Sequence, residues 1–138
     1  MPSKTQILKF LDKAKQESTK STFFKQKVGC VMTIGNKPIV VAHNSEKTYP
    51  IQKKYNRYRN FRRPEEDNHA YIHAEMQALQ NTKYLDIDWE DVVLYVGRQT
   101  RTGEQGLAKP CPACQKAIKE RGIGTVYYTL NNDGFDVL

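Results

Sequence analysis

Two segments that are predicted to open helices carry side chains able to meet at one metal ion. The first reads His73-Ala74-Glu75, and the second reads Pro110-Cys111-Pro112-Ala113-Cys114. Cysteines three residues apart lie on one face of a helical turn, so Cys111 and Cys114 can bind the same ion. His73 is the candidate third ligand. A fold that satisfies this pattern must bring two helix N-termini together from distant parts of the chain.

The candidate ligands favour zinc. The helix dipole lowers the pKa of a thiol near a helix N-terminus, and Zn²⁺ binds both thiolate sulfur and imidazole nitrogen. Three protein ligands leave a fourth position to water, as in catalytic zinc sites, and zinc lowers the pKa of that water to about 7. Glu75 lies about 200° around a helix from His73, so the two side chains should not approach one ion from the same direction. We therefore expect Glu75 to act as a general acid and base instead of a ligand.

The alternative is a closed structural site in which Cys30 or His69 is the fourth ligand. Cys30 lies in an apolar run, however, and is expected to pack in the core.

The apolar periodicity predicts a three-layer α/β/α fold. Alternating helix and strand in the second half implies parallel pairing there, beside an antiparallel N-terminal hairpin that turns at Gly35-Asn36. We expect a mixed five-stranded sheet that ends in a C-terminal hairpin. Helices are predicted from Ser3 to Ser18, from His73 to near Tyr84 and from Cys111 to Arg121, and strands at 28–34, 39–42, 92–96, 125–130 and 135–138.

Composition limits the class of protein. A chain of 138 residues fits a single domain, 1–138. Its 22 basic and 15 acidic residues give a net charge of +7, which suggests an anionic partner. We find no signal peptide and no apolar run of membrane-spanning length, and the chain has three cysteines. We therefore expect a reduced, cytoplasmic protein that has no membrane partner.

At its two helix-opening segments the chain resembles the zinc-dependent cytidine and deoxycytidylate deaminase superfamily, whose mark is H-x-E followed by P-C-x-x-C. The order of elements is similar to that fold from about Lys4 to Leu130. The resemblance implies Zn²⁺ as cofactor and hydrolytic deamination, in which activated water attacks C4 of cytosine while Glu75 carries protons and ammonia leaves. Adenine C6 is the competing position. The resemblance also implies a homo-oligomer.

The resemblance further implies substrate contacts. Asn44, which follows the second predicted strand, is expected to contact the sugar, and the backbone of Ala74 is expected to face the base. Pro110 precedes the first cysteine ligand, and His69 lies one helical turn before His73. We expect both to line the substrate pocket.

A basic segment precedes the first metal-binding segment. Residues 53–63 hold six positive charges and no acidic residue, interleaved with three aromatic residues. Three interpretations stay open: a nucleic-acid surface on which Tyr55 stacks and Arg57 and Arg59 follow phosphates, a helix with a buried aromatic face, or arginines that hold the 5′-phosphate of a mononucleotide.

Two features depart from the family pattern. Gly97 to Lys109 replaces a short connection, and this loop could shape the pocket mouth. The chain also lacks the extra helix and parallel fifth strand of deoxycytidylate, tRNA-adenosine and polynucleotide deaminases, and its C-terminal hairpin is more similar to the free-cytidine and toxin-type branches.

The leading hypothesis is a zinc-dependent deaminase that converts cytosine to uracil in a pyrimidine nucleoside or nucleotide such as dCMP. The alternative within this class is a cytosine deaminase that acts on single-stranded DNA or RNA. The alternative outside it is a zinc-stabilised nucleic-acid-binding module without catalysis.

Overall fold

The computed structural model describes residues 2–22, 26–47, 49–58 and 71–138. Its strands form a mixed sheet in the order β2-β1-β3-β5-β6, and the short β4 pairs with the end of β3. The elements along the chain are α1 (Lys4–Ser18), β1 (Val28–Ile34), β2 (Lys37–His43), α2 (Pro50–Tyr55), η1 (Asn56–Tyr58), α3 (Ala74–Asn81), η3 (Trp89–Asp91), β3 (Val92–Gln99), β4 (Gln105–Gly106), α4 (Pro112–Arg121), β5 (Thr125–Thr129) and β6 (Phe135–Val137).

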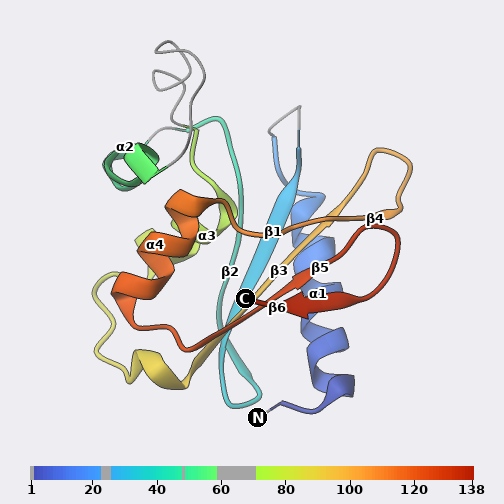
Figure 1. Cartoon of the computed structure of the whole chain (residues 1–138), viewed down its shortest axis with the longest axis horizontal. Helices are drawn as coiled ribbons and strands as arrows, with labels where there is room; N and C mark the ends of the chain where they lie inside the picture. Colours follow the sequence, from blue (N-terminus) through green and yellow to red (C-terminus); the bar gives the residue numbers. More distant parts are fainter. Residues whose placement is uncertain (1, 23–25, 48, 59–70) are drawn as a thin grey trace.

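Helices cover both faces of the sheet, which confirms the three-layer α/β/α fold. Helix α1 lies on one side of the strands, and α3 and α4 lie on the other (Figure 1). Neighbouring side chains of a strand point to opposite faces. Val31 and Tyr95 therefore pack with Phe10 of α1, whereas Met32 and Leu94 pack in the core beneath α3 and α4.

The predicted pairing of the strands is confirmed. β1 and β2 form an antiparallel hairpin, β3 and β5 are parallel, and β6 returns antiparallel to β5. Ser3 and Gln6 form the capping box that starts α1. Gly122 adopts a left-handed conformation with φ of 96° at the end of α4, where a residue without Cβ is unstrained.

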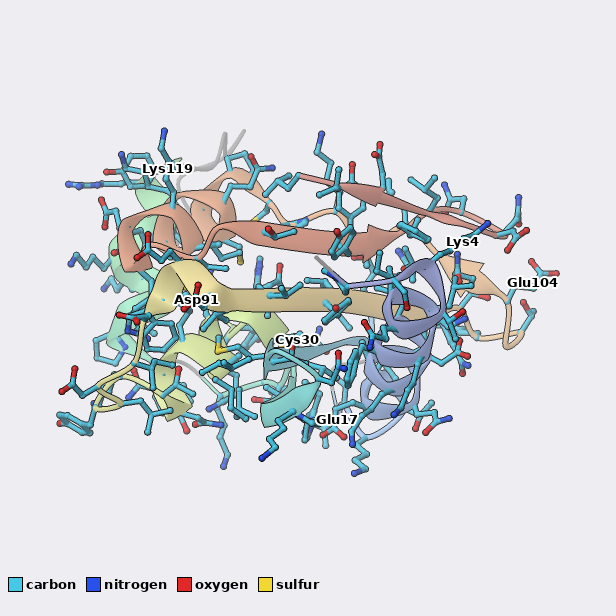
Figure 2. All side chains as sticks on the ribbon, turned by 90° about the horizontal axis from the view of Figure 1, so that it is seen from below. Lys4, Glu17, Cys30, Asp91, Glu104 and Lys119 are labelled. Carbon is cyan, nitrogen blue, oxygen red and sulfur yellow. The ribbon has the colours of Figure 1, made fainter. Side chains whose placement is uncertain are left out.

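The loop that departs from the family pattern is an extension of the sheet. β3 continues to Gln99, and the chain returns as β4, in which Gln105 accepts a hydrogen bond from Lys15 of α1 at 3.0 Å. Figure 2 shows Glu104 on the α1 side of the molecule, far from Lys119 of α4. The tip of this hairpin therefore lies beside α1, and the chain reaches α4 after β4.

Two other expectations about the elements were wrong. α3 ends at Asn81 instead of continuing toward Tyr84, because the Thr82 hydroxyl donates to the Ala78 carbonyl at 2.7 Å and Arg121 donates to the Leu79 carbonyl at 3.0 Å. These side chains satisfy carbonyl groups that a longer helix would use. The predicted element order also lacked α2 and β4, and because β4 pairs with β3 the sheet of the described residues has six strands instead of the expected five. No helix in the described part of the chain combines the length and apolar character needed to cross a membrane.

A pair of glycines allows α1 to approach the sheet closely. Gly29 of β1 and Gly97 of β3 are cross-strand neighbours. A Cβ at Gly29 would lie 2.2 Å from the carbonyl oxygen of Ala14, and one at Gly97 would lie 3.1 Å from that of Leu11. Because both obstacles are helix backbone, side chains at these positions would push α1 away from the sheet.

We expect Gly29→Ala to lower the free energy of unfolding by about 3 kcal/mol, at the upper end of overpacking costs. Gly35→Ala is the control, because its Cβ meets nothing within 4 Å and the change should cost about 1–2 kcal/mol for the left-handed backbone. The midpoint of urea denaturation measures both. Equal midpoints for Gly29→Ala and the unmodified protein would contradict the close packing.

Candidate metal centre and active site

The structure brings His73, Cys111 and Cys114 together. The Nδ1 atom of His73 lies 3.5 Å from Cys111 Sγ and 3.4 Å from Cys114 Sγ. The three ligand atoms all lie within 4.8 Å of one another. Tetrahedral zinc with Zn–S near 2.3 Å and Zn–N near 2.0 Å requires nitrogen–sulfur separations of roughly 3.5 Å. The donor set and its spacing therefore fit a zinc ion without rearrangement.

Two helix starts hold these ligands. His73 and Cys111 are the N-cap residues of α3 and α4, and neither side chain caps its helix by a hydrogen bond. The side chains of both residues instead point toward a shared position. Pro112 begins α4 without an N–H group that would need a partner, and Cys114 follows in the same first turn.

The two thiols differ in proton affinity. A hydrogen bond from the Cys114 thiol lowers the pKa of Cys111 to about 4. Burial opposes this shift, and His73 adds to it. Burial raises the pKa of Cys114 well above its usual value, and the hydrogen bond to Cys111 adds to this shift. At neutral pH, Cys111 is therefore a thiolate and Cys114 its donor. Binding of a metal by both sulfurs releases the proton from Cys114.

Glu75 is buried beside the thiols. Its side chain is 4% exposed and lies within hydrogen-bonding contact of Cys114. Burial raises the pKa of Glu75 above its usual value, in opposition to the attraction of His73. A carboxyl group with a raised pKa is suited to accept and return a proton near neutral pH. Glu75 is absent from the three-residue cluster found among the described residues, in agreement with an acid–base role.

Gln52 and Asn56 support the histidine ligand, and neither role was predicted from the sequence. Gln52 of α2 is fully buried, and its Oε1 accepts a hydrogen bond from the backbone N–H of His73 at 3.0 Å. Its Nε2 donates to Asn56 Oδ1 at 2.8 Å. This amide pair fixes the backbone at the start of α3. Two uncharged amides four residues apart in a basic segment are the sequence signal that could have found them.

Cys30 lies outside the metal cluster, as expected for a core residue. It is fully buried, and its Sγ donates to the carbonyl oxygen of Ala74 at 3.2 Å. The closed structural site with Cys30 as fourth ligand is therefore wrong. His69, the other candidate for that role, lies outside the described residues, as does Arg59.

Three predicted substrate contacts lie on segments next to the cluster. Asn44 is buried, its Oδ1 accepts from the N–H of Val28 at 2.9 Å, and its Nδ2 donates to the carbonyl of Gln26 at 2.6 Å. Ala74 is buried between two site residues. Pro110 is buried before Cys111. Their contacts with a substrate remain predictions.

The contacts of Tyr55 lie away from the metal cluster. The Tyr55 hydroxyl donates to Glu120, which lies nine residues, or roughly 13 Å, beyond Cys111 along α4. Tyr55 instead lines a hollow of about 260 Å³ between α2, α3 and α4. The Arg57 guanidinium lies 4.9 Å from the ring centre of Tyr58. That Tyr55 and Arg57 contact a substrate remains a prediction.

The comparisons with known proteins agree with this geometry. The family model described as the cytidine and deoxycytidylate deaminase zinc-binding region matches residues 4–130. Among solved structures, the chain is similar to the dCMP deaminase from the cyanophage S-TIM5 in its apo form, with a TM-score of 0.64 and 20% identity over 96% of this chain and 88% of that chain. At this identity the similarity concerns the fold. No curated protein matches the chain.

Cys111→Ser is expected to remove most of the zinc from the purified protein, because a hydroxyl is a far poorer zinc ligand than a thiolate. Cys30→Ser, a matched change at a buried cysteine outside the cluster, should keep the zinc content of the unmodified protein. Elemental analysis of zinc per chain measures both. Full zinc occupancy in Cys111→Ser would remove this residue from the site.

Gln52→Leu is expected to weaken zinc binding about 10-fold, because the backbone of His73 loses the acceptor that fixes it. Gln77→Leu is the control, since the Gln77 amide donates to Asn81 within α3. Competition with a chromogenic chelator gives the zinc affinity of each variant. Equal affinities for Gln52→Leu and the unmodified protein would show that Gln52 does not position the ligand.

Proposed function

Because the chain belongs to the cytidine and deoxycytidylate deaminase family, we propose that it converts cytosine to uracil in a pyrimidine nucleoside or nucleotide, with dCMP as the representative substrate. Family membership makes the chain a zinc-dependent hydrolytic deaminase. The observation that carries the proposal is the convergence of three ligand atoms within 4.8 Å of one another, with the buried carboxyl group of Glu75 beside them.

The site residues have two different roles, metal binding and proton transfer. His73, Cys111 and Cys114 would hold the zinc, which when bound supplies Lewis-acid activation of water at neutral pH. Glu75 accepts a proton from the attacking water and donates a proton to the amino group that leaves C4. The water oxygen becomes the C4 carbonyl oxygen, and the amino group leaves as ammonia. Cytosine and water are thereby converted to uracil and ammonia.

Two observations favour a small substrate. The solved structure to which the fold is similar is that of a dCMP deaminase. The sheet ends in an antiparallel β5–β6 hairpin, which resembles the free-cytidine and toxin-type branches of the family more than the polynucleotide deaminases. A net charge of +7 favours an anionic nucleotide over an uncharged nucleoside.

The aromatic residues in the described part of the basic segment favour a small substrate over a polynucleotide. The ring of Tyr58 already lies within 4.9 Å of the Arg57 guanidinium and 5.5 Å of Lys116 Nζ. Tyr55 is buried and bonded to Glu120. Rings that are engaged in this way offer little free face on which bases could stack.

Glu75→Gln is expected to retain zinc and fold but to lower kcat for dCMP by about 10²- to 10⁴-fold, because the amide cannot carry the proton. Glu46→Gln, a matched change at an exposed glutamate, should leave turnover unchanged. Uracil formation is measured by mass change with dCMP, deoxycytidine, dCTP and single-stranded oligonucleotides.

The same panel ranks the alternatives. Uracil from oligonucleotides but not from free nucleotides would favour the polynucleotide substrate. The absence of uracil from every substrate, in protein that holds a full complement of zinc, would reject cytosine deamination. Unchanged turnover in Glu75→Gln would exclude this residue as the general base.

A further inference from the structure

Arg98, near the end of β3, is a half-buried cation with a donor that is not satisfied. Its Nη1 donates to the carbonyl oxygen of Leu107 at 3.3 Å. Its buried Nε has no hydrogen-bond partner among the described residues, and none of the ion pairs found among them includes Arg98. A buried donor without an acceptor is costly, so its presence requires an explanation.

The side chain of Arg98 lies on the sheet face that holds the metal cluster. Successive side chains of a strand alternate between faces. Val96 packs in the core beneath α3 and α4, and Arg98 follows it on the same side. The adjacent Gln99 points to the α1 face, where its cross-strand partner Gln105 accepts a hydrogen bond from Lys15.

The strand register places Arg98 close to the start of α3. Cys30 is paired with Val96, and its Sγ contacts the carbonyl oxygen of Ala74, which lies between the histidine ligand and the buried glutamate. Arg98 is paired with Val28, two residues, or roughly 7 Å, further along the strands. The backbone of Arg98 therefore lies one step beyond the point where the sheet touches the catalytic helix, and its guanidinium lies against the segment that leads to α4, where it donates to Leu107, four residues before Cys111.

The backbone of Arg98 also lies near the expected sugar contact, Asn44. The N–H of Val28, its cross-strand neighbour, donates to Asn44 Oδ1 at 2.9 Å. Arg98, Val28 and Asn44 thus follow one another across the end of the sheet. In open α/β sheets, ligands bind at the carboxyl ends of the strands, and β3 ends here.

We propose that the Arg98 guanidinium binds the phosphate on the 5′-oxygen of the nucleotide whose base is deaminated, so that the enzyme selects nucleotides over nucleosides. This inference rests on the proposed function. A guanidinium presents its N–H donors as a planar fork that matches two phosphate oxygens. Because it lacks a carboxylate partner among the described residues, its charge is available to an anion.

Gly106 of β4 sets the position of this fork. A Cβ at Gly106 would lie 2.7 Å from Arg98 Nε and 2.9 Å from its Cζ. Since glycine has no Cβ, the guanidinium can lie against the backbone of β4. The hairpin that departs from the family pattern thereby supplies both the cation and the surface that orients it.

The test compares dCMP with deoxycytidine, which differ by the phosphate. Arg98→Met keeps the apolar stem but removes the charge, and it should lower kcat/KM for dCMP about 10- to 100-fold while deoxycytidine is unaffected. Gly106→Ala leaves the charge in place but displaces the guanidinium, so it should raise KM for dCMP and again spare deoxycytidine. Arg101→Met, on the exposed loop, is the control and should change neither.

Equal losses for both substrates in Arg98→Met would assign Arg98 a structural role and overturn the proposal. Unchanged kinetics with dCMP would do the same. Deamination of an oligonucleotide, rather than dCMP, that depends on Arg98 would support the phosphate contact and identify a phosphodiester as its source.

A binding measurement separates this inference from the proposed function. Calorimetry should show that zinc-loaded protein binds dUMP more tightly than deoxyuridine, and that Arg98→Met removes this preference. Such a result would stand even if the protein deaminated no cytosine compound. If dUMP binds no better than deoxyuridine, or binds equally to both proteins, Arg98 is not the phosphate ligand.

Discussion

The metal ligands lie where two helices begin, and this placement constrains how the helices and strands around them are arranged. The positive ends of the α3 and α4 dipoles point toward one place, and anionic sulfur at Cys111 offsets their repulsion. Both helices must therefore start at the same edge of the sheet. With α4 as the crossover between β3 and β5, parallel pairing of these strands follows.

The buried polar groups around the metal cluster lower the stability of the fold. Glu75, Gln52 and Asn56 are all buried, and the Nδ2 atom of Asn56 has no hydrogen-bond partner among the described residues. An apolar core of the same shape would avoid these desolvation costs. What the polar groups provide instead is a fixed histidine backbone and a carboxyl group whose proton affinity is raised. Local departures from good packing rules are expected at a functional site.

The parts of this structure that follow from local pattern could be predicted from the sequence. The capping residues of α1, the hairpin at Gly35-Asn36 and the spacing of Cys111 and Cys114 each reflect contacts between near neighbours. β4 could not be predicted, because its two residues gain their structure from pairing with β3. The role of Gln52 was equally hidden, since its partner is the backbone of a residue on another helix. The end of α3 depends on Arg121 of α4 and is likewise a tertiary effect.

The return of the chain through β4 separates the tip of the β3–β4 hairpin from the metal cluster and Glu75. The Gln105 amide donates to the carbonyl oxygens of Leu130 and Gly134 and accepts from Lys15, so it ties three segments together at the base of the hairpin. Exposed tips on anchored bases tolerate added sequence best. Gly103 has open space around it. An insertion at this position is therefore expected to leave the metal cluster and Glu75 undisturbed.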